Sequence, residues 1–144
     1  MTTVQRAHSN DAVRAIRAFY EAADARPLDV ARLRSFFADD FVDHDATHDD
    51  RHAEGAVGTF SALADGAPDS HHELVMVLAS GDDKAIVYWR YKGTNTNHLF
   101  GLPTAARPKA FDIAGIEIYT VRDGKITEMW HVEEIHKLVE TLTG

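Results

Sequence analysis

The sequence predicts an α+β fold, in which helices come first and a curved antiparallel sheet follows. Two observations predict this fold class: apolar residues recur at helical spacing in the first part of the chain, and they alternate with period two from residue 73 to residue 132. Helices and strands separated along the chain in this way are typical of α+β domains, with the helices on one face of the sheet. The 144 residues fit a single domain, residues 1–144, that can enclose a pocket.

Three helices are predicted before the sheet and one after it. Ser9 or Asn10 can cap the first helix, and Pro27 ends it. The apolar stripe of this helix consists of Ala12, Val13, Ile16, Phe19, Tyr20 and Ala23. A short second helix is expected within residues 28–37 and a third over residues 53–64. The last helix, residues 133–142, is expected to place on one face Ile135, Leu138, Val139 and Leu142.

A brief strand is expected at residues 39–44, and longer strands are expected at residues 73–79, 84–92 and 109–132. The last of these is interrupted by the hairpin turn Arg122-Asp123-Gly124. If Asp123-Gly124 alone forms a two-residue loop, position 117 lies opposite 130. If all three residues form a turn with a bulge at Gly124, position 117 lies opposite 129 and position 115 opposite 131.

We prefer the bulged register because it separates the side chains of the hairpin by character. One face then collects Ile116, Ile118, Ile126 and Trp130. The other face carries Gly115, Glu117, Tyr119, Thr127, Met129 and His131. The first face suits packing or a subunit interface. The second mixes ionisable and apolar groups, which is typical of a ligand cavity.

Composition argues against several classes of function. The formal net charge of −8, without clustered Lys or Arg, disfavours nucleic acid and membrane surfaces as partners. No apolar stretch resembles a signal peptide or a membrane span, so we expect a cytoplasmic protein. The absence of Cys excludes disulfides, a thiolate nucleophile and Cys-ligated zinc. No phosphate loop or dinucleotide fingerprint is present, so we expect no cofactor.

Short motifs along nearly the whole chain carry a family resemblance. They are Ala18-Phe19-Tyr20, Phe41-Val42-Asp43-His44, residues 93–97 (GTNTN), residues 100–104 (FGLPT) and the hairpin segments GIEIY and DGKITEMW within residues 115–130. In these segments the chain resembles the SnoaL-like polyketide cyclases of the nuclear transport factor 2-like (NTF2-like) superfamily. The resemblance implies a cone of curved antiparallel sheet around a pocket closed by about three N-terminal helices, with a short C-terminal helix. It also implies a homodimer or a higher homo-oligomer.

The resemblance implies which residues act. In the cyclases, an Asp just after the strand that begins with DGKI is the general acid/base of a cofactor-free intramolecular aldol reaction, and that position is His131 here. Glu117 stands where those enzymes often have a His, and Asp43 matches a polar pocket residue of the first strand. We expect His131 to remove a proton beside a carbonyl while Glu117 orients it and Asp43 or a water stabilises the oxygen. The alternative is a structural His–carboxylate pair without catalytic duty.

Further side chains are expected to contact an apolar substrate. They are Tyr20, His44, Phe60, Trp89, Phe100 and Met129. His44, His48 and His52 recur every four residues, which raises the question of a metal site. Ligands must converge on the metal, however, and the first and third His are two helical turns apart. We therefore interpret Asp43 and His44 as cavity wall, and His48, Asp49, Asp50 and His52 as a solvated rim that binds no metal.

The leading hypothesis is a cofactor-independent enzyme that uses general acid/base catalysis on an apolar carbonyl compound, leading to cyclisation. Dehydratase, isomerase or hydrolase chemistry with the same residues is an alternative within enzymes. A dimeric domain that binds a small molecule without catalysis is the alternative from another class. Three ionisable groups around one cavity favour the enzyme, because a mere binder has little reason to bury them.

Overall fold

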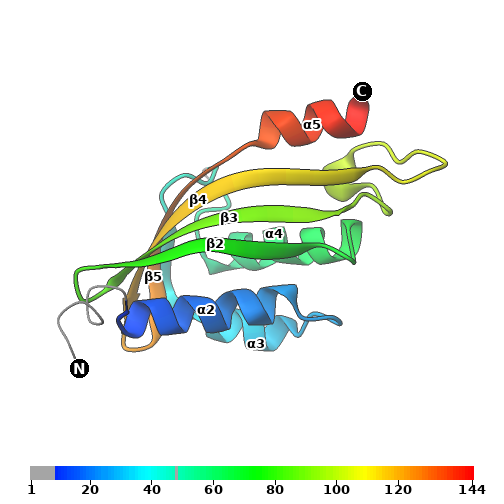
Figure 1. Ribbon diagram of the computed structural model, residues 1–144. Helices are drawn as coiled ribbons and strands as arrows, with labels where there is room; N and C mark the ends of the chain where they lie inside the picture. The colour runs from blue at the N-terminus through cyan, green and yellow to red at the C-terminus, as the bar shows by residue number, and fades with distance from the viewer. Residues whose placement is uncertain (1–8, 48) are drawn as a thin grey trace.

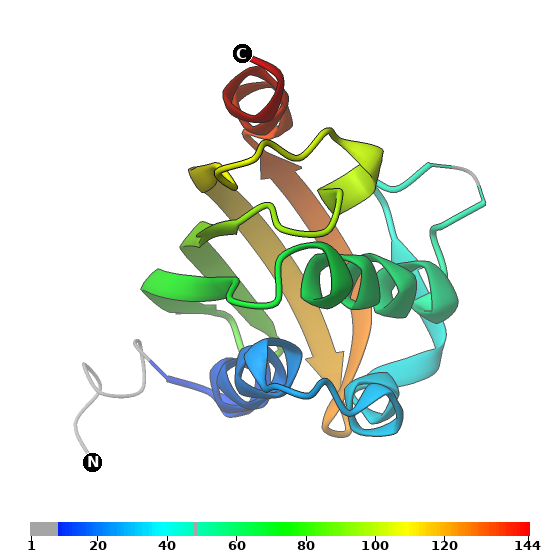
Figure 2. The same ribbon diagram turned by 90° about the vertical axis from the view of Figure 1, so that its right-hand side faces the viewer.

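The computed structural model describes residues 9–47 and 49–144 and has two layers (Figure 1). A curved five-stranded sheet forms one layer, and helices on its concave side form the other. Seen end-on, α4 (Ala53–Gly66) lies inside the curve of the sheet, with α2 (Asp11–Asp24) and α3 (Val30–Ser35) at one end and α5 (Ile135–Thr143) at the other (Figure 2). The α+β class is confirmed. In the part of the chain that the structure describes, no helix is long and apolar enough to cross a membrane.

Capping side chains fix where the first helices begin. Asn10 caps α2, because its side-chain oxygen accepts a hydrogen bond from the backbone N–H of Val13 at 2.7 Å. Asp29 caps α3 in the same way through Arg32, at 3.0 Å. The predicted helices are therefore present, with α3 shorter than residues 28–37.

The strand order is β1-β5-β4-β3-β2. The strands are β1 (Phe37–Asp43), β2 (His71–Ser80), β3 (Lys84–Thr94), β4 (Ala110–Arg122) and β5 (Lys125–Glu133). The neighbours β2, β3, β4 and β5 pair antiparallel, whereas β1 pairs parallel to β5 at the sheet edge. The parallel edge matters for the site because it brings the C-terminal end of β1 to the middle of β5.

The turn of the β4–β5 hairpin differs from the preferred prediction. Arg122 pairs with Lys125, so only Asp123 and Gly124 form the loop. Both have positive φ, 53° and 74°, which is the conformation of a type I′ turn. The two-residue loop, the alternative to the preferred bulged turn, is the one that forms.

The hairpin nevertheless contains a bulge, which lies farther from the turn than predicted. Thr127 is the extra residue of β5, between one register near the turn and another beyond it. Beyond the bulge Glu117 lies directly opposite His131, which corrects both predicted registers. The bulge also turns Ile126 into the core, where it is 1% exposed, instead of onto the outer face with Ile116.

Aromatic side chains fasten α2 and α4 to the sheet. Phe19 of α2 is fully buried and makes edge-on ring contacts with aromatic residues from α2, α4, β1, β4 and the end of α3. Edge-to-face pairs of this kind add about 0.5–1.5 kcal/mol each beyond the burial of their surface. This cluster fills one end of the cone and leaves the space between α4 and α5 open.

Candidate functional site

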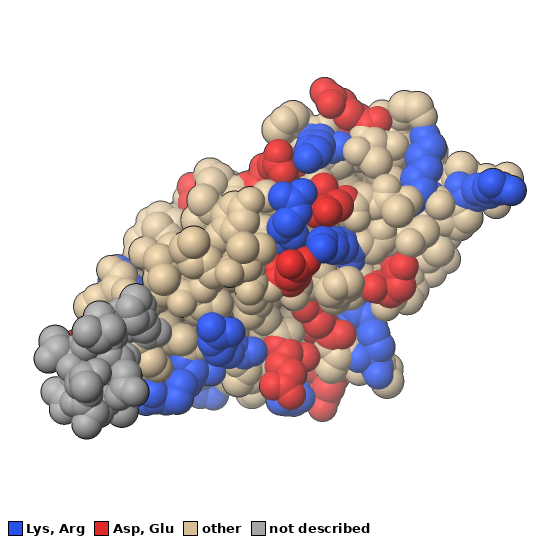
Figure 3. All heavy atoms as spheres, viewed as in Figure 1, with Lys and Arg blue, Asp and Glu red and all other residues tan. Residues whose placement is uncertain are grey.

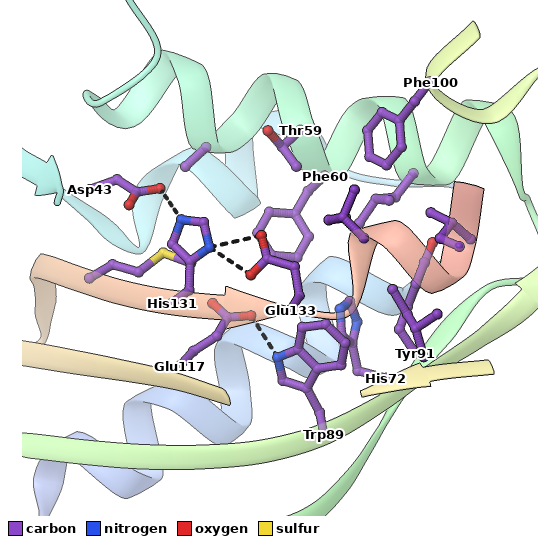
Figure 4. A pocket seen from close by; sticks show the side chains of 16 residues that line it. Asp43, Thr59, Phe60, His72, Trp89, Tyr91, Phe100, Glu117, His131 and Glu133 are labelled. Atoms are coloured by element: carbon purple, nitrogen blue, oxygen red, sulfur yellow. Dashed lines mark hydrogen bonds and ion pairs between the residues drawn. The ribbon is translucent and has the colours of Figure 1, made fainter. Parts of the chain in front are cut away.

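A cavity of about 120 Å³ lies between the concave face of the sheet, α4 and α5 (Figure 4). Most of its wall is apolar, and Phe60, Trp89, Phe100 and Met129, which the sequence predicted to contact a substrate, line it. Five acidic or imidazole side chains also line it: Asp43, His72, Glu117, His131 and Glu133. An apolar wall with a few convergent polar groups is the usual form of a small-molecule site.

Two carboxylates bracket the imidazole of His131. Its Nε2 lies 2.9 Å from Asp43 Oδ2, and its Nδ1 lies 2.7 Å from Glu133 Oε2 (Figure 4). Glu133 is two residues along β5 from His131, and side chains two apart in a strand share a face. Asp43 arrives from β1, whose parallel pairing sets Asp43 beside Met129. We call Asp43, His131 and Glu133 the carboxylate–imidazole cluster.

The loop after β1 holds this cluster in place. The backbone N–H of His131 donates to Asp45 Oδ2 at 2.7 Å, and the backbone N–H of Asp45 donates to Asp43 Oδ1 at 3.0 Å. Asp45 therefore connects the end of β1 to β5 and leaves Oδ2 of Asp43 for the imidazole.

The two carboxylates change the protonation state of His131. Hydrogen bonds to Asp43 and Glu133 raise the pKa of His131 from 6.5 to about 10, against the opposing effect of burial. At neutral pH the ring is therefore an imidazolium that donates from both nitrogens. Such a ring is a proton donor, so the predicted role of His131 as the base of the resting protein does not fit its surroundings.

Glu117 lines the cavity but is hydrogen bonded elsewhere than predicted. Its two carboxylate oxygens accept from Trp89 Nε1 at 2.6 Å and from the Tyr119 hydroxyl at 2.5 Å, whereas Asp43 and Glu133 orient His131. Burial raises the pKa of the Glu117 carboxyl above its ordinary value. Glu117 thus fixes the indole of Trp89, which forms part of the cavity wall.

A second imidazole reaches the cavity from β2. His72 Nδ1 lies 2.8 Å from Asp24 Oδ1, and the His72 backbone N–H donates to Asp24 Oδ2 at 2.7 Å. Asp24 is the last residue of α2, so this pair also joins the helix to the edge strand. The side chain of His72 is 4% exposed and lies against Trp89 and Tyr91 (Figure 4).

Two residues predicted to bind substrate lie outside the cavity. The hydroxyl of Tyr20 is 2.8 Å from that of Tyr119, in the core behind the cavity wall. His44 stacks on Trp130 with ring centroids 4.6 Å apart, and its Nε2 lies 3.0 Å from Glu128 Oε2. Neither residue therefore lines the cavity in which we expected them to contact a substrate.

The His-rich loop connects β1 to α4. His48 lies outside the described residues. The ring of His52 is 3.2 Å from the carbonyl of Phe41, and His52 precedes α4 as its N-cap residue. Among residues 9–47 and 49–144, no group of three or more His, Cys, Asp or Glu side chains is arranged to hold a metal ion.

The sequence reasoning missed Glu133, Asp24 and His72 as site residues. Glu133 could have been found by continuing the period-two pattern of β5 one residue further, but we assigned it to the start of the last helix. His72 directly precedes the predicted strand 73–79, and no local motif links it to Asp24, which is 48 positions away. Only the packing of α2 on β2 brings that pair together.

Comparisons with known proteins agree with this architecture. A model of the SnoaL-like polyketide cyclase family matches residues 10–141. No curated protein matches the sequence. A candidate SnoaL-like polyketide cyclase from Jannaschia sp. CCS1 shares 17% identity and superposes with a TM-score of 0.77, covering 93% of this chain and 92% of its own.

Two further solved structures are similar in sequence as well as fold. A candidate polyketide cyclase from Bacillus cereus ATCC 10987 shares 26% identity, covers 92% of this chain and 80% of its own, and has a TM-score of 0.74. IdmH, a candidate polyketide cyclase from Streptomyces antibioticus, shares 25% identity, covers 91% of this chain and 97% of its own, and also has a TM-score of 0.74. The fold is that of the NTF2-like proteins, and the chain belongs to the SnoaL-like polyketide cyclase family.

Proposed function

We propose that the protein is an enzyme that closes a ring in a small carbonyl compound by an intramolecular aldol reaction, without a cofactor. The observation that carries this proposal is the carboxylate–imidazole cluster, which presents a protonated imidazole at the wall of an apolar cavity. The family to which the chain belongs supports the reaction type.

The cluster supplies the proton that an aldol reaction consumes. When an enolate carbon attacks a second carbonyl of the same molecule, a carbon–carbon bond forms and negative charge develops on the carbonyl oxygen. A buried cationic donor stabilises that charge, and it protonates the oxygen as the bond forms. His131 holds the proton, and Asp43 and Glu133 keep the ring oriented and charged. All these groups belong to this chain.

The size of the cavity limits the substrate. An apolar cavity of about 150 Å³ in another protein holds one benzene molecule. The cavity here, about 120 Å³, therefore encloses a group of roughly one six-membered ring. We propose that the reacting ring lies inside and that the rest of a larger substrate extends past Phe100, which is 48% exposed.

The main competing proposal is a domain that binds a small molecule without catalysis. Pure binding of an apolar ligand gains nothing from burying a cation between two carboxylates, because desolvation of these charges is costly. The cluster therefore favours catalysis over binding alone.

Heptane-2,6-dione is a suitable probe because its aldol closure forms a single six-membered ring. We expect the protein to accelerate this closure, measured by NMR as the appearance of the hydroxyketone and the enone derived from it. His131→Gln removes the cation but keeps a similar volume, and it should lower the rate on the order of 10²-fold or more. His136→Gln, an exposed His on α5, is the matched control and should leave the rate unchanged. Equal rates for wild type and His131→Gln would sink the proposal.

A further inference from the structure

The structure assigns His72 as the general base of the proposed reaction, with Asp24 as the residue that positions it. This inference rests on the proposed function, because it names the group that removes the proton from the substrate carbon. It is needed because the carboxylate–imidazole cluster holds a proton at rest, so the abstracted proton must go to another group.

The hydrogen bonds of His72 determine which nitrogen faces the cavity. Nδ1 donates to Asp24, which does not line the cavity, so the Nδ1 edge of the ring is turned toward α2. Within the described chain, Nε2 of His72 has no hydrogen-bond partner. Nε2 is not among the fully buried side-chain nitrogen and oxygen atoms that lack a hydrogen-bond partner, so part of its surface is accessible. Since His72 lines the cavity and its Nδ1 edge is turned toward α2, we infer that Nε2 is the atom that the ring offers to a ligand there.

Asp24 also sets the chemistry of that nitrogen. A carboxylate that accepts from Nδ1–H keeps the neutral imidazole in the tautomer with a lone pair on Nε2. The second oxygen of Asp24 accepts from the His72 backbone N–H, which fixes the carboxylate as well. The rings of Tyr20, Phe60, Trp89 and Tyr91 surround the imidazole and limit its rotation. A base held in one tautomer and one orientation suits proton abstraction from carbon.

The two imidazoles then have separate roles in the reaction. His72 Nε2 takes the proton from the carbon beside one carbonyl, and the resulting enolate carbon forms the new bond to the second carbonyl carbon. The electron pair of that carbonyl goes to its oxygen, which takes a proton from the carboxylate–imidazole cluster. The substrate is isomerised with no net gain or loss of protons. His72 returns its proton to solvent and His131 regains one after the product leaves.

Exchange of carbon-bound hydrogen tests the general base independently of the general acid. In D₂O, removal and return of a proton beside either carbonyl of heptane-2,6-dione replaces hydrogen by deuterium, which NMR detects without ring closure. We expect the wild type to catalyse exchange and His72→Gln to reduce it on the order of 10²- to 10⁴-fold. His71→Gln, the exposed neighbour on the same strand, is the matched control and should exchange like the wild type.

A second variant, Asp24→Asn, tests the positioning role of Asp24. Chemical rescue of His72→Ala then distinguishes loss of the base from misfolding. Asp24→Asn can still accept from the His72 backbone N–H, but its amide NH₂ would face Nδ1 and favour the tautomer that protonates Nε2. We expect kcat for exchange to fall while KM stays similar. Added imidazole should restore exchange in His72→Ala, which has room for it, but not in Asp24→Asn.

The outcomes distinguish this inference from the proposed function. Loss of exchange in both His72→Gln and Asp24→Asn, with rescue of His72→Ala, supports the assignment. Wild-type exchange and closure in His72→Gln would overturn the assignment and leave the proposed function standing. A wild type that accelerates neither exchange nor closure over buffer would overturn both.

Discussion

Gly115 leaves the space that the indole of Trp89 occupies at the cavity wall. The two residues are paired across β3 and β4, and a Cβ atom on residue 115 would lie 2.3 Å from Cζ2 of the indole. The indole in turn donates its N–H to Glu117. The shape of the cavity therefore depends on the absence of a side chain at position 115.

Gly115→Ala should consequently destabilise the protein by about 1–3 kcal/mol, the usual cost of overpacking a filled core. It should also displace Trp89, which fluorescence would detect as a change in emission. Gly58→Ala is the matched control, because a Cβ at residue 58 meets nothing within 4 Å. In the interior of α4 that change should stabilise by about 0.5–1 kcal/mol. Similar unfolding free energies for the two variants would contradict this account.

His131 makes the stability of the protein depend on pH. Its pKa is raised on folding from 6.5 to about 10, so the folded protein binds this proton more tightly than the unfolded chain. The stabilisation is fully present below pH 6.5 and is lost as the pH rises through about 10. Denaturant unfolding should therefore show a gap between wild type and His131→Gln that is largest below pH 6.5 and shrinks toward pH 10. A gap that widens with pH would reverse the sign of this argument.

At the scale of the elements, α5 closes the cavity with Ile135 and Leu138, and of these two only Leu138 is buried. Leu138 is 1% exposed and lines the cavity, whereas its neighbour Val139 is 39% exposed. The start of α5 is fixed to β4, since Glu134 Oε1 accepts from the Ala114 N–H at 2.8 Å and the Glu134 N–H donates back to Ala114. The predicted four-residue apolar face is therefore only half buried.

Leu138→Ala should destabilise the protein by about 2–5 kcal/mol, because the change removes buried apolar contacts and leaves a larger cavity. Val139→Ala on the same helix should cost about 0.5 kcal/mol or less. Chemical denaturation measures both changes. Leu138→Ala should also bind ring compounds that carry one additional substituent more tightly than the wild type binds them, because its cavity is larger. Equal affinities of the two proteins for these compounds would contradict the role of α5 in closing the cavity.

Sequence patterns predicted the elements well and the contacts between distant residues poorly. Capping by Asn10, the helical stripe of α2 and the period-two strands depend on local physics that neighbouring residues reveal. The position of the β-bulge depended instead on tertiary packing, which moved Thr127 out of register and buried Ile126. A turn motif two residues away carries no information about that choice.

The candidate site shows the same division. Asp43, Glu117 and His131 were found because the family resemblance and the hairpin pattern place them on one cavity wall. The hydrogen bonds between these residues were not predicted. The contact of Asp43 with His131, for example, depends on the parallel β1–β5 edge, which no local pattern reveals.

At the scale of the whole molecule, the outer face of the sheet is the surface most suited to a second copy of the chain. Met76, Ile116 and Val132 on this face are 50%, 42% and 69% exposed. Figure 3 shows a broad area without charged side chains beside a region where both signs alternate. The ion pairs Arg90–Asp112 and Lys92–Glu73 join neighbouring strands of the sheet. A copy related by a twofold axis can meet opposite charges there, so a homodimer stays our prediction.

Val132→Lys should turn such a dimer into a monomer, because it places a charge in the apolar part of the contact. Val30→Lys is the control, since Val30 is similarly apolar and 48% exposed but lies on α3, away from this face. Light scattering coupled to gel filtration gives the mass of each species. A wild-type monomer at high concentration, or a Val132→Lys variant that stays dimeric, would contradict the prediction.

The central claim is that two carboxylates keep His131 protonated inside the cavity. The most direct test is the ¹⁵N chemical shift of the His131 ring between pH 5 and 11, with His131→Gln used to assign the signal. The account predicts a doubly protonated ring at pH 8 that loses its proton only near pH 10, and a lower pKa in Asp43→Asn. A ring that is neutral at pH 8 and titrates near 6.5 would contradict it.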